Sequence, residues 1–124
     1  MVCTAFSFGC NDLIDIDPEI SSLVFILNYS GLKTKASCQG HYTDWHYQFP
    51  WVCIQDKDID ALRKIVSDYN SVSSFNWVIS LHEASKEWLL RPYSVDRSLE
   101  QMHREVFKLT HFLSRRLIKK ERLA

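Results

Sequence analysis

One short segment near the middle of the chain holds most of the side chains that could carry chemistry. Residues 34–41 read Thr-Lys-Ala-Ser-Cys-Gln-Gly-His, so hydroxyl, thiol, amide and imidazole groups surround a single glycine. Hydroxyl and amide groups bind polar ligands, and a glycine allows a positive φ angle or close approach of a ligand to the backbone. The competing interpretation is a polar turn after an edge strand. We predict a ligand-binding loop formed by Thr34, Ser37, Cys38, Gln39, Gly40 and His41.

Aromatic side chains crowd the positions that follow. Six ring-bearing residues fall within residues 42–51, and each nucleobase stacked on such a ring contributes about 1–3 kcal/mol. Trp45 is the candidate for stacking on a ligand, whereas Trp51 is expected to be buried with its strand. Arg91 precedes Pro92 at a predicted strand end, where a guanidinium can hold a phosphate or carboxylate through two hydrogen bonds. An ordinary surface charge is the alternative for Arg91.

Cys38 and His41 are the candidate catalytic residues. A thiolate beside an imidazole base forms a nucleophilic pair, and the base needs a third group such as Asp44 to orient it. The same two residues are zinc ligands, but two ligands do not complete a zinc site, and we predict no metal. The four cysteines lie at irregular spacing without a C-x-x-C pair, so we expect reduced thiols. A buried and inert cysteine is the alternative at position 38.

Apolar periodicity predicts the elements that position this loop. We expect a short strand at residues 2–8, followed by two helix-strand-strand groups and a last long helix at residues 98–120. The first group has its helix at 18–30 and its strands at 32–38 and 51–55, and the second has its helix at 56–69 and its strands at 76–82 and 87–91. Asp17 and either Asp56 or Asp58 are predicted helix N-caps, and Gly31 is predicted to end the first helix. The order (β)αββαββα predicts an α+β fold, a two-layer sandwich with a long C-terminal helix.

The composition is that of one small globular domain, which we place at residues 1–124. The apolar share is 46%, and no run reaches the roughly 18 apolar residues of a membrane span. Fifteen basic residues balance fifteen acidic ones, which argues against bulk binding of nucleic acid. Residues 1–60 carry a net charge of −5 and residues 61–124 carry +5, so the basic half can complete an anion site on folding. We expect a cytoplasmic protein that does not bind membranes.

The last predicted helix has an apolar stripe that admits two interpretations. Its members recur at alternating spacings of three and four residues, and they are Leu99, Met102, Val106, Leu109, Leu113 and Leu117. Such a stripe can face the core of its own chain. It also suits the seam of a homo-oligomer, in which Leu109 and Leu113 would contact a second copy.

Part of the sequence resembles a known enzyme family. Asp17-Pro18-Glu19-Ile20, then Leu27-Asn28, then Thr34-x-x-Ser37-Cys38-Gln39-Gly40-His41 are similar to the opening of the wybutosine-synthesis tRNA methyltransferases. With Pro50-Trp51-Val52, the pattern also resembles small uncharacterised bacterial and phage proteins that carry Thr-x-x-Ser-Cys-x-Gly-His. The enzyme resemblance covers residues 15–54 and implies a compact α/β fold with this loop at a nucleotide or S-adenosylmethionine site. His41 and Gln39 depart from the enzyme pattern, which has Arg and Ser there, so the ligand pocket carries over better than methyl transfer.

The residues and the resemblance together predict a small-molecule-binding protein. Its ligand is expected to be nucleotide-like or phosphorylated, to bind around the Ser-Cys-Gln-Gly-His loop, and to need no cofactor. A phage or prophage protein of this kind can act by sequestering a nucleotide signal. The alternative is a nucleotide- or RNA-modifying enzyme, which would use S-adenosylmethionine or the Cys38 and His41 pair.

Overall fold

The computed structural model of the chain describes residues 18–38, 40, 49–55, 59–82, 86–94 and 96–123. The elements in these residues are α1 (Ser21–Tyr29), β1 (Thr34–Cys38), β2 (Trp51–Ile54), α2 (Asp60–Val72), β3 (Trp77–His82), β4 (Glu87–Pro92) and α3 (Leu99–Leu123). This order confirms the predicted α+β class and the long C-terminal helix. The additional strand predicted at residues 2–8 lies outside the described residues.

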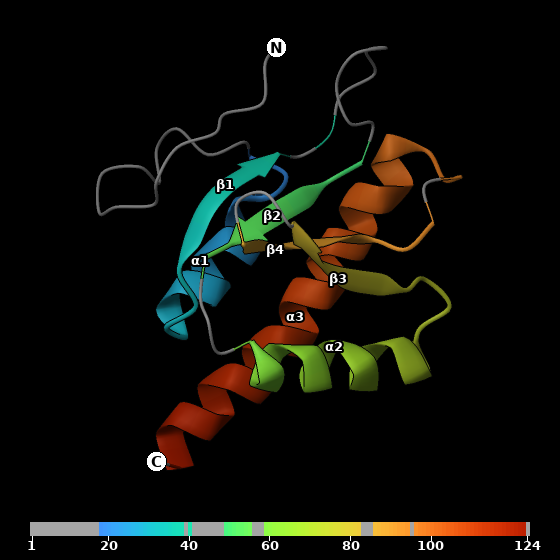
Figure 1. The fold of residues 1–124 in the computed structure, drawn as a ribbon. Coiled ribbons are helices and arrows are strands. Elements are labelled where there is room, and N and C mark those ends of the chain that lie inside the picture. The colour runs from blue at the N-terminus through green and yellow to red at the C-terminus, as the bar shows by residue number, and fades with distance from the viewer. Residues whose placement is uncertain are drawn as a thin grey trace.

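The four strands form one antiparallel sheet in the order β1-β2-β4-β3. Each helix-strand-strand group contributes one antiparallel pair, β1 with β2 and β3 with β4, and the two groups meet where β2 pairs with β4 (Figure 1). The first strand of each group therefore lies at an edge of the sheet and the second lies at its centre. The two groups have this same arrangement although the sequence shows no internal repeat.

The hydrophobic core lies between one face of the sheet and the three helices. Along β2, Val52 and Ile54 are fully buried while Trp51 and Cys53 are partly exposed, as expected when alternate side chains point to opposite faces. Leu90 of β4 pairs with Val52 and is also fully buried. These residues join the apolar residues of α1, α2 and α3 in a single cluster. We call the face with Val52 and Leu90 the helix side, and the other face the open side.

The apolar stripe of α3 belongs to this core. Leu99, Met102, Val106, Leu109, Leu113 and Leu117 are each at most 8% exposed. Helix α3 contacts both other helices, so the stripe is covered by the sheet, α1 and α2 within one chain. Leu109 and Leu113 are therefore not available as an oligomer seam while the chain is folded.

The helix ends agree only in part with the predicted caps. Gly31 has a φ of 91°, its N–H donates to Asn28, and the Leu32 N–H donates to Leu27, which confirms a glycine-ended helix of the Schellman type. Helix α2 begins at Asp60 after Ile59, which makes no side-chain capping bond, so the predicted start at residue 56 is wrong, while the predicted caps Asp56 and Asp58 lie outside the described residues. Burial of Ile59 in the core fixes this helix start instead. The predicted Asp17 cap lies outside the described residues.

Two asparagines fasten the helices to the strands that follow them. The Asn70 side chain accepts from the Trp77 N–H at 2.9 Å and donates to the Trp77 carbonyl at 2.8 Å, which ties α2 to the start of β3. Asn28 plays the same part for α1, because its amide donates to the Thr34 hydroxyl at 2.7 Å and accepts from the Thr34 N–H at 3.3 Å. An amide side chain suits this position because it both donates and accepts.

Replacement of Asn70 by alanine should destabilise the protein. The variant leaves the backbone N–H and carbonyl of buried Trp77 without the side-chain partners that they have now, and we expect a loss of about 1–3 kcal/mol in the free energy of unfolding. Urea denaturation followed by circular dichroism measures it. The control is Ser71→Ala, which removes one exposed hydrogen bond to Asp68; an equal loss in both variants would contradict the role given to Asn70.

Candidate functional site

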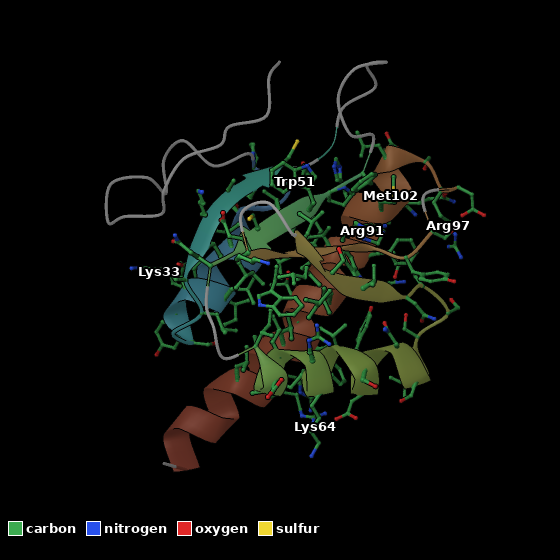
Figure 2. All side chains as sticks on the ribbon, viewed as in Figure 1. Lys33, Trp51, Lys64, Arg91, Arg97 and Met102 are labelled. Carbon is green, nitrogen blue, oxygen red and sulfur yellow. The ribbon has the colours of Figure 1, made fainter. Side chains whose placement is uncertain are left out.

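Two residues of the predicted ligand-binding segment, Cys38 and Gly40, lie at one end of the sheet. Strand β1 ends at Cys38, and β2 begins at Trp51 directly opposite it. Because β4 runs antiparallel to β2, the last residues of β4, including Arg91, reach this same end. Helix α3 also begins here, since its first residue Leu99 lies next to Gly40. Figure 2 shows Trp51, Arg91 and Met102, near the start of α3, in the upper part of the molecule.

A β-bulge decides which face of β1 each candidate residue occupies. The register of β1 against β2 shifts between Thr34 and Ala36. As a result Thr34 and Ser37 pair with Ile54 and Val52 and lie on the helix side, while Cys38 pairs with Trp51 and lies on the open side. Thr34 and Ser37 are both buried, and Thr34 is bonded to Asn28. The described structure therefore does not bring them together with Cys38 on one surface.

Cys38 is fully buried and disulfide-bonded. The expectation of reduced thiols is thus wrong at this position, although Cys53 is a free thiol. A bonded sulfur cannot form the thiolate that a nucleophile or a zinc ligand requires. Disulfides are also rare in the reducing cytosol, so the bonded Cys38 does not fit the cytoplasmic location expected from the sequence, which stays a prediction.

Gly40 occupies a position that only glycine fits. Its φ is +90°, and a Cβ built there would lie 2.7 Å from Cδ1 of Leu99 and 2.9 Å from the carbonyl carbon of Phe49. The Gly40 N–H donates to the Cys38 sulfur at 3.3 Å. The predicted positive φ of Gly40 is confirmed. The groups that approach the Gly40 backbone closely are Leu99 of α3 and the backbone of Phe49. Gln39, His41 and Trp45 lie outside the described residues.

Arg91 lies on the open side, beside the aromatic ring that opens β2. Arg91 pairs with Val78 of β3. On its other side, the preceding residue Leu90 pairs with Val52 of β2. Because the two strands are antiparallel, the residue after Leu90 and the residue before Val52 are neighbours, and these are Arg91 and Trp51. The Arg91 side chain is partly exposed, and its Nη1 donates to the Pro92 carbonyl at 3.1 Å. Among the residues that the structure describes, no carboxylate lies in ion-pair contact with Arg91.

A polar cluster on the open side was not predicted from the sequence. Glu87 is 6% exposed, and its two carboxylate oxygens contact the Lys35 ammonium at 3.0 Å and the Cys53 thiol at 3.3 Å. Desolvation, and then the hydrogen bond and negative charge of Glu87, raise the pKa of Cys53 to about 12 against the partial opposition of Lys35. The three residues come from three strands and are separated by 18 and 34 positions, so spacing gave no signal.

Comparison with protein-family models, curated proteins and solved structures found no match to this chain. The described residues contain no group of three histidine, cysteine or acidic side chains placed to hold a metal ion. In the same residues, no helix is both long and apolar enough to cross a membrane. The site is therefore defined by its own geometry, with Gly40, Trp51 and Arg91 at one end of the sheet.

Substitution of Gly40 by alanine should be much more costly than the same change at Gly31. Both glycines have positive φ, which costs an alanine about 1–2 kcal/mol, but a Cβ at Gly31 meets nothing within 4 Å. The crowding by Leu99 and Phe49 should add about 1–3 kcal/mol at Gly40 alone. Chemical denaturation of the two variants measures the difference, and equal losses would show that the crowding is absent.

Alkylation of Cys53 should remain slow in the folded protein until the pH is far above neutral. Because the thiolate is the reactive form and the pKa is raised from 9.0 to about 12, the rate should rise about tenfold per pH unit without a plateau near pH 9. Mass spectrometry after timed treatment with iodoacetamide measures the rate. Glu87→Gln, which removes the carboxylate charge, should speed the reaction at fixed pH; a native plateau near pH 9 would contradict the assignment.

Proposed function

We propose that this chain is a small-molecule-binding protein whose ligand is anionic and planar, such as a nucleotide or a related phosphorylated compound. The ligand would bind on the open side of the sheet, at the end where Cys38 of β1, Trp51 of β2 and Arg91 of β4 lie. The observation that carries the proposal is Arg91 itself, a partly exposed guanidinium beside an aromatic ring with no carboxylate partner among the described residues.

The chemistry of Arg91 and Trp51 supports an anion with a ring. A guanidinium has five donors, and the contact with the Pro92 carbonyl uses Nη1 alone, which leaves donors for a phosphate. The indole of the neighbouring Trp51 is a side chain of the kind on which nucleobases stack. In this proposal Gly40 supplies the tight backbone of the loop, while Gln39, His41 and Trp45 provide the remaining contacts to the ligand.

Binding is proposed here in preference to catalysis. The Cys38 and His41 mechanism needs a thiolate, and the disulfide at Cys38 leaves none. A protein of this size that holds a ligand without converting it can act by sequestering it, and a phage-encoded protein that removes a nucleotide signal is the form of this role that we favour. The proposal requires no cofactor.

Isothermal titration calorimetry of the full chain tests the proposal. The ligand panel contains mononucleotides, cyclic dinucleotides and S-adenosylmethionine, and we expect heat from at least one phosphorylated member. Arg91→Ala should weaken that binding about tenfold or more, because a hydrogen bond to a charged group contributes about 1.5–3 kcal/mol. The control is Arg104→Ala, which removes an exposed arginine on α3.

Three outcomes would contradict the proposal. The first is a folded wild-type protein that gives no heat with any member of the panel. The second is equal weakening by Arg91→Ala and Arg104→Ala, which would place the anion away from Arg91. The third is conversion of the bound ligand to a product, detected by chromatography after incubation, which would make the protein an enzyme.

A further inference from the structure

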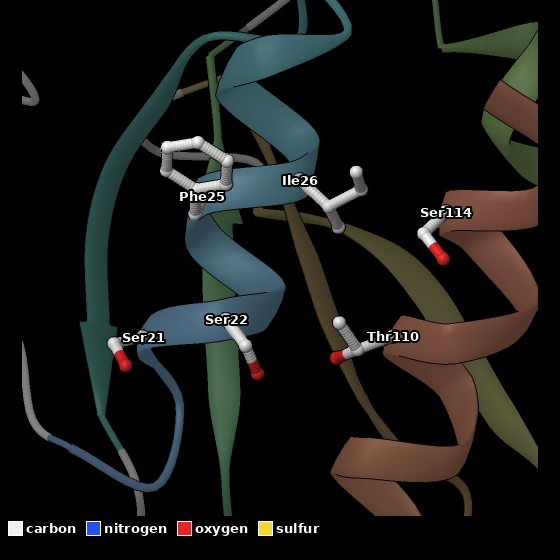
Figure 3. A pocket seen from close by; sticks show the side chains of 6 residues that line it. All are labelled: Ser21, Ser22, Phe25, Ile26, Thr110 and Ser114. Carbon is white, nitrogen blue, oxygen red and sulfur yellow. The ribbon is translucent and has the colours of Figure 1, made fainter. Parts of the chain in front are cut away.

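A second surface, distant from Arg91 in the fold, is a groove between α1 and α3. Its volume is about 500 Å³, and it is lined by Ser21, Ser22, Phe25, Ile26, Thr110 and Ser114. Figure 3 shows Ser22 and Ile26 pointing from α1 toward α3, with Thr110 and Ser114 on the facing side of α3. We call this feature the α1/α3 groove.

The walls of the α1/α3 groove present little polarity. The hydroxyls of Ser21, Thr110 and Ser114 donate to the nearby backbone carbonyls of Pro18, Val106 and His111, at 3.0, 2.7 and 2.8 Å. These three side chains therefore present carbon rather than free donors to the groove, whereas the buried Ser22 hydroxyl has no hydrogen-bond partner among the described residues. Small side chains also allow another backbone to approach closely, as helices do when they pack about 8–10 Å apart.

Large aromatic side chains flank the groove and remain in water. Phe25 is 53% exposed, Tyr29 is 55% exposed and stacks on Phe25 at 6.0 Å between ring centres, and Phe107 of α3 is 48% exposed. Phe25 lines the groove, and Tyr29 and Phe107 lie one helical turn from its lining residues Phe25 and Thr110. A single exposed aromatic residue needs no explanation, but three so close in the fold form an apolar patch of the kind that marks interaction sites. Anchors of this type typically dominate the energy of helix-in-groove recognition.

Charge decides what the groove is suited to accept. Helix α1 carries no charged residue, although Glu19 lies just before it, whereas α3 presents Arg104, Lys108 and Arg115 outward at spacings of four and seven residues, with Glu100 one turn before Arg104. Lys108 is paired with Glu105, but neither Arg104 nor Arg115 has an acidic partner among the described residues. These positions form a cationic row along the exposed side of α3, beyond Phe107.

We propose that the α1/α3 groove binds an amphipathic α-helix of a partner protein that carries aspartate or glutamate beside its apolar stripe. The apolar stripe would lie between Phe25 and Phe107, and the acidic residues would face the cationic row. A second copy of this chain, docked groove to groove, is a poorer occupant because it would bring two cationic rows together. A nucleic acid would match the charges but would leave the apolar walls without a complementary surface.

Selection from a display library tests the proposal. The library contains helical peptides with leucine fixed at every third or fourth position and all flanking positions free. The target is the full wild-type chain, and peptides that also bind Ser114→Trp, in which the indole fills the groove, are discarded. We expect the surviving peptides to be enriched in aspartate and glutamate at the flanking positions. Circular dichroism and the mass in solution establish that Ser114→Trp is folded and monomeric.

Fluorescence anisotropy of a selected peptide then assigns the contacts. Phe25→Ala and Phe107→Ala remove exposed rings without opening the core, and each should weaken binding about tenfold, which corresponds to 1.4 kcal/mol. The double variant Arg104→Glu with Arg115→Glu should weaken it similarly, and added salt should mimic that effect. The matched control is Lys64→Glu on the exposed side of α2, which should leave binding unchanged.

Several results would overturn the proposal. They are survival of no peptide, survival of peptides without an acidic bias, and equal binding to wild type and to the Phe25→Ala and Phe107→Ala variants. Dimerisation of the wild-type chain that Ser114→Trp abolishes would assign the groove to a second copy instead. Tight binding of a labelled RNA through Arg104 and Arg115, with no binding of peptide, would assign the cationic row to nucleic acid.

Discussion

The burial of one side of α3 is the constraint on which the rest of the molecule depends. Its apolar stripe runs from Leu99 to Leu117 and is covered by the sheet on one side and by α1 and α2 on its flanks. A four-stranded sheet with one helix per strand pair leaves room between the two helices, and α3 fills it. Leu99 also packs against Gly40, so the start of α3 limits the conformation of the backbone at Gly40. The hydrophobic core and the candidate site are therefore in direct contact through Leu99.

The two helix-strand-strand groups use the same device to join helix and strand. An asparagine near the end of each helix, Asn28 in α1 and Asn70 in α2, bonds to the first residue of the following edge strand. Edge strands have a neighbour on one side only, so a side-chain bond from the preceding helix holds their start in register. With both edges held in this way, β2 and β4 can pair at the centre and set Trp51 beside Arg91.

The fold leaves two surfaces with different chemistry. On the open side of the sheet, Arg91 and Trp51 combine a cation with an aromatic ring, while Lys35 forms an ion pair with Glu87, which also accepts a hydrogen bond from the Cys53 thiol. On the helical layer, the walls of the α1/α3 groove are mostly apolar, and Arg104 and Arg115 of α3 have no acidic partner among the described residues. Among the described residues of 61–124, positive charge therefore occurs on both surfaces, with Arg91 on the sheet and Arg104 and Arg115 on α3.

The sequence by itself determined the class of fold, the order of the elements and most of their limits, because apolar spacing and turn residues such as Gly31 act locally. It also indicated that Gly40 allows a positive φ, which the structure shows. Only the tertiary structure decided that the register shift in β1 places Thr34 on the same face as Ser37 and away from Cys38, since a bulge depends on the partner strand. Similarly, the use of Leu109 and Leu113 inside the chain, the disulfide at Cys38 and the contact of Cys53 with Glu87 depend on residues that are distant in sequence. The apolar periodicity of the sequence predicts which side chains are buried, but it does not predict which residues pack against them.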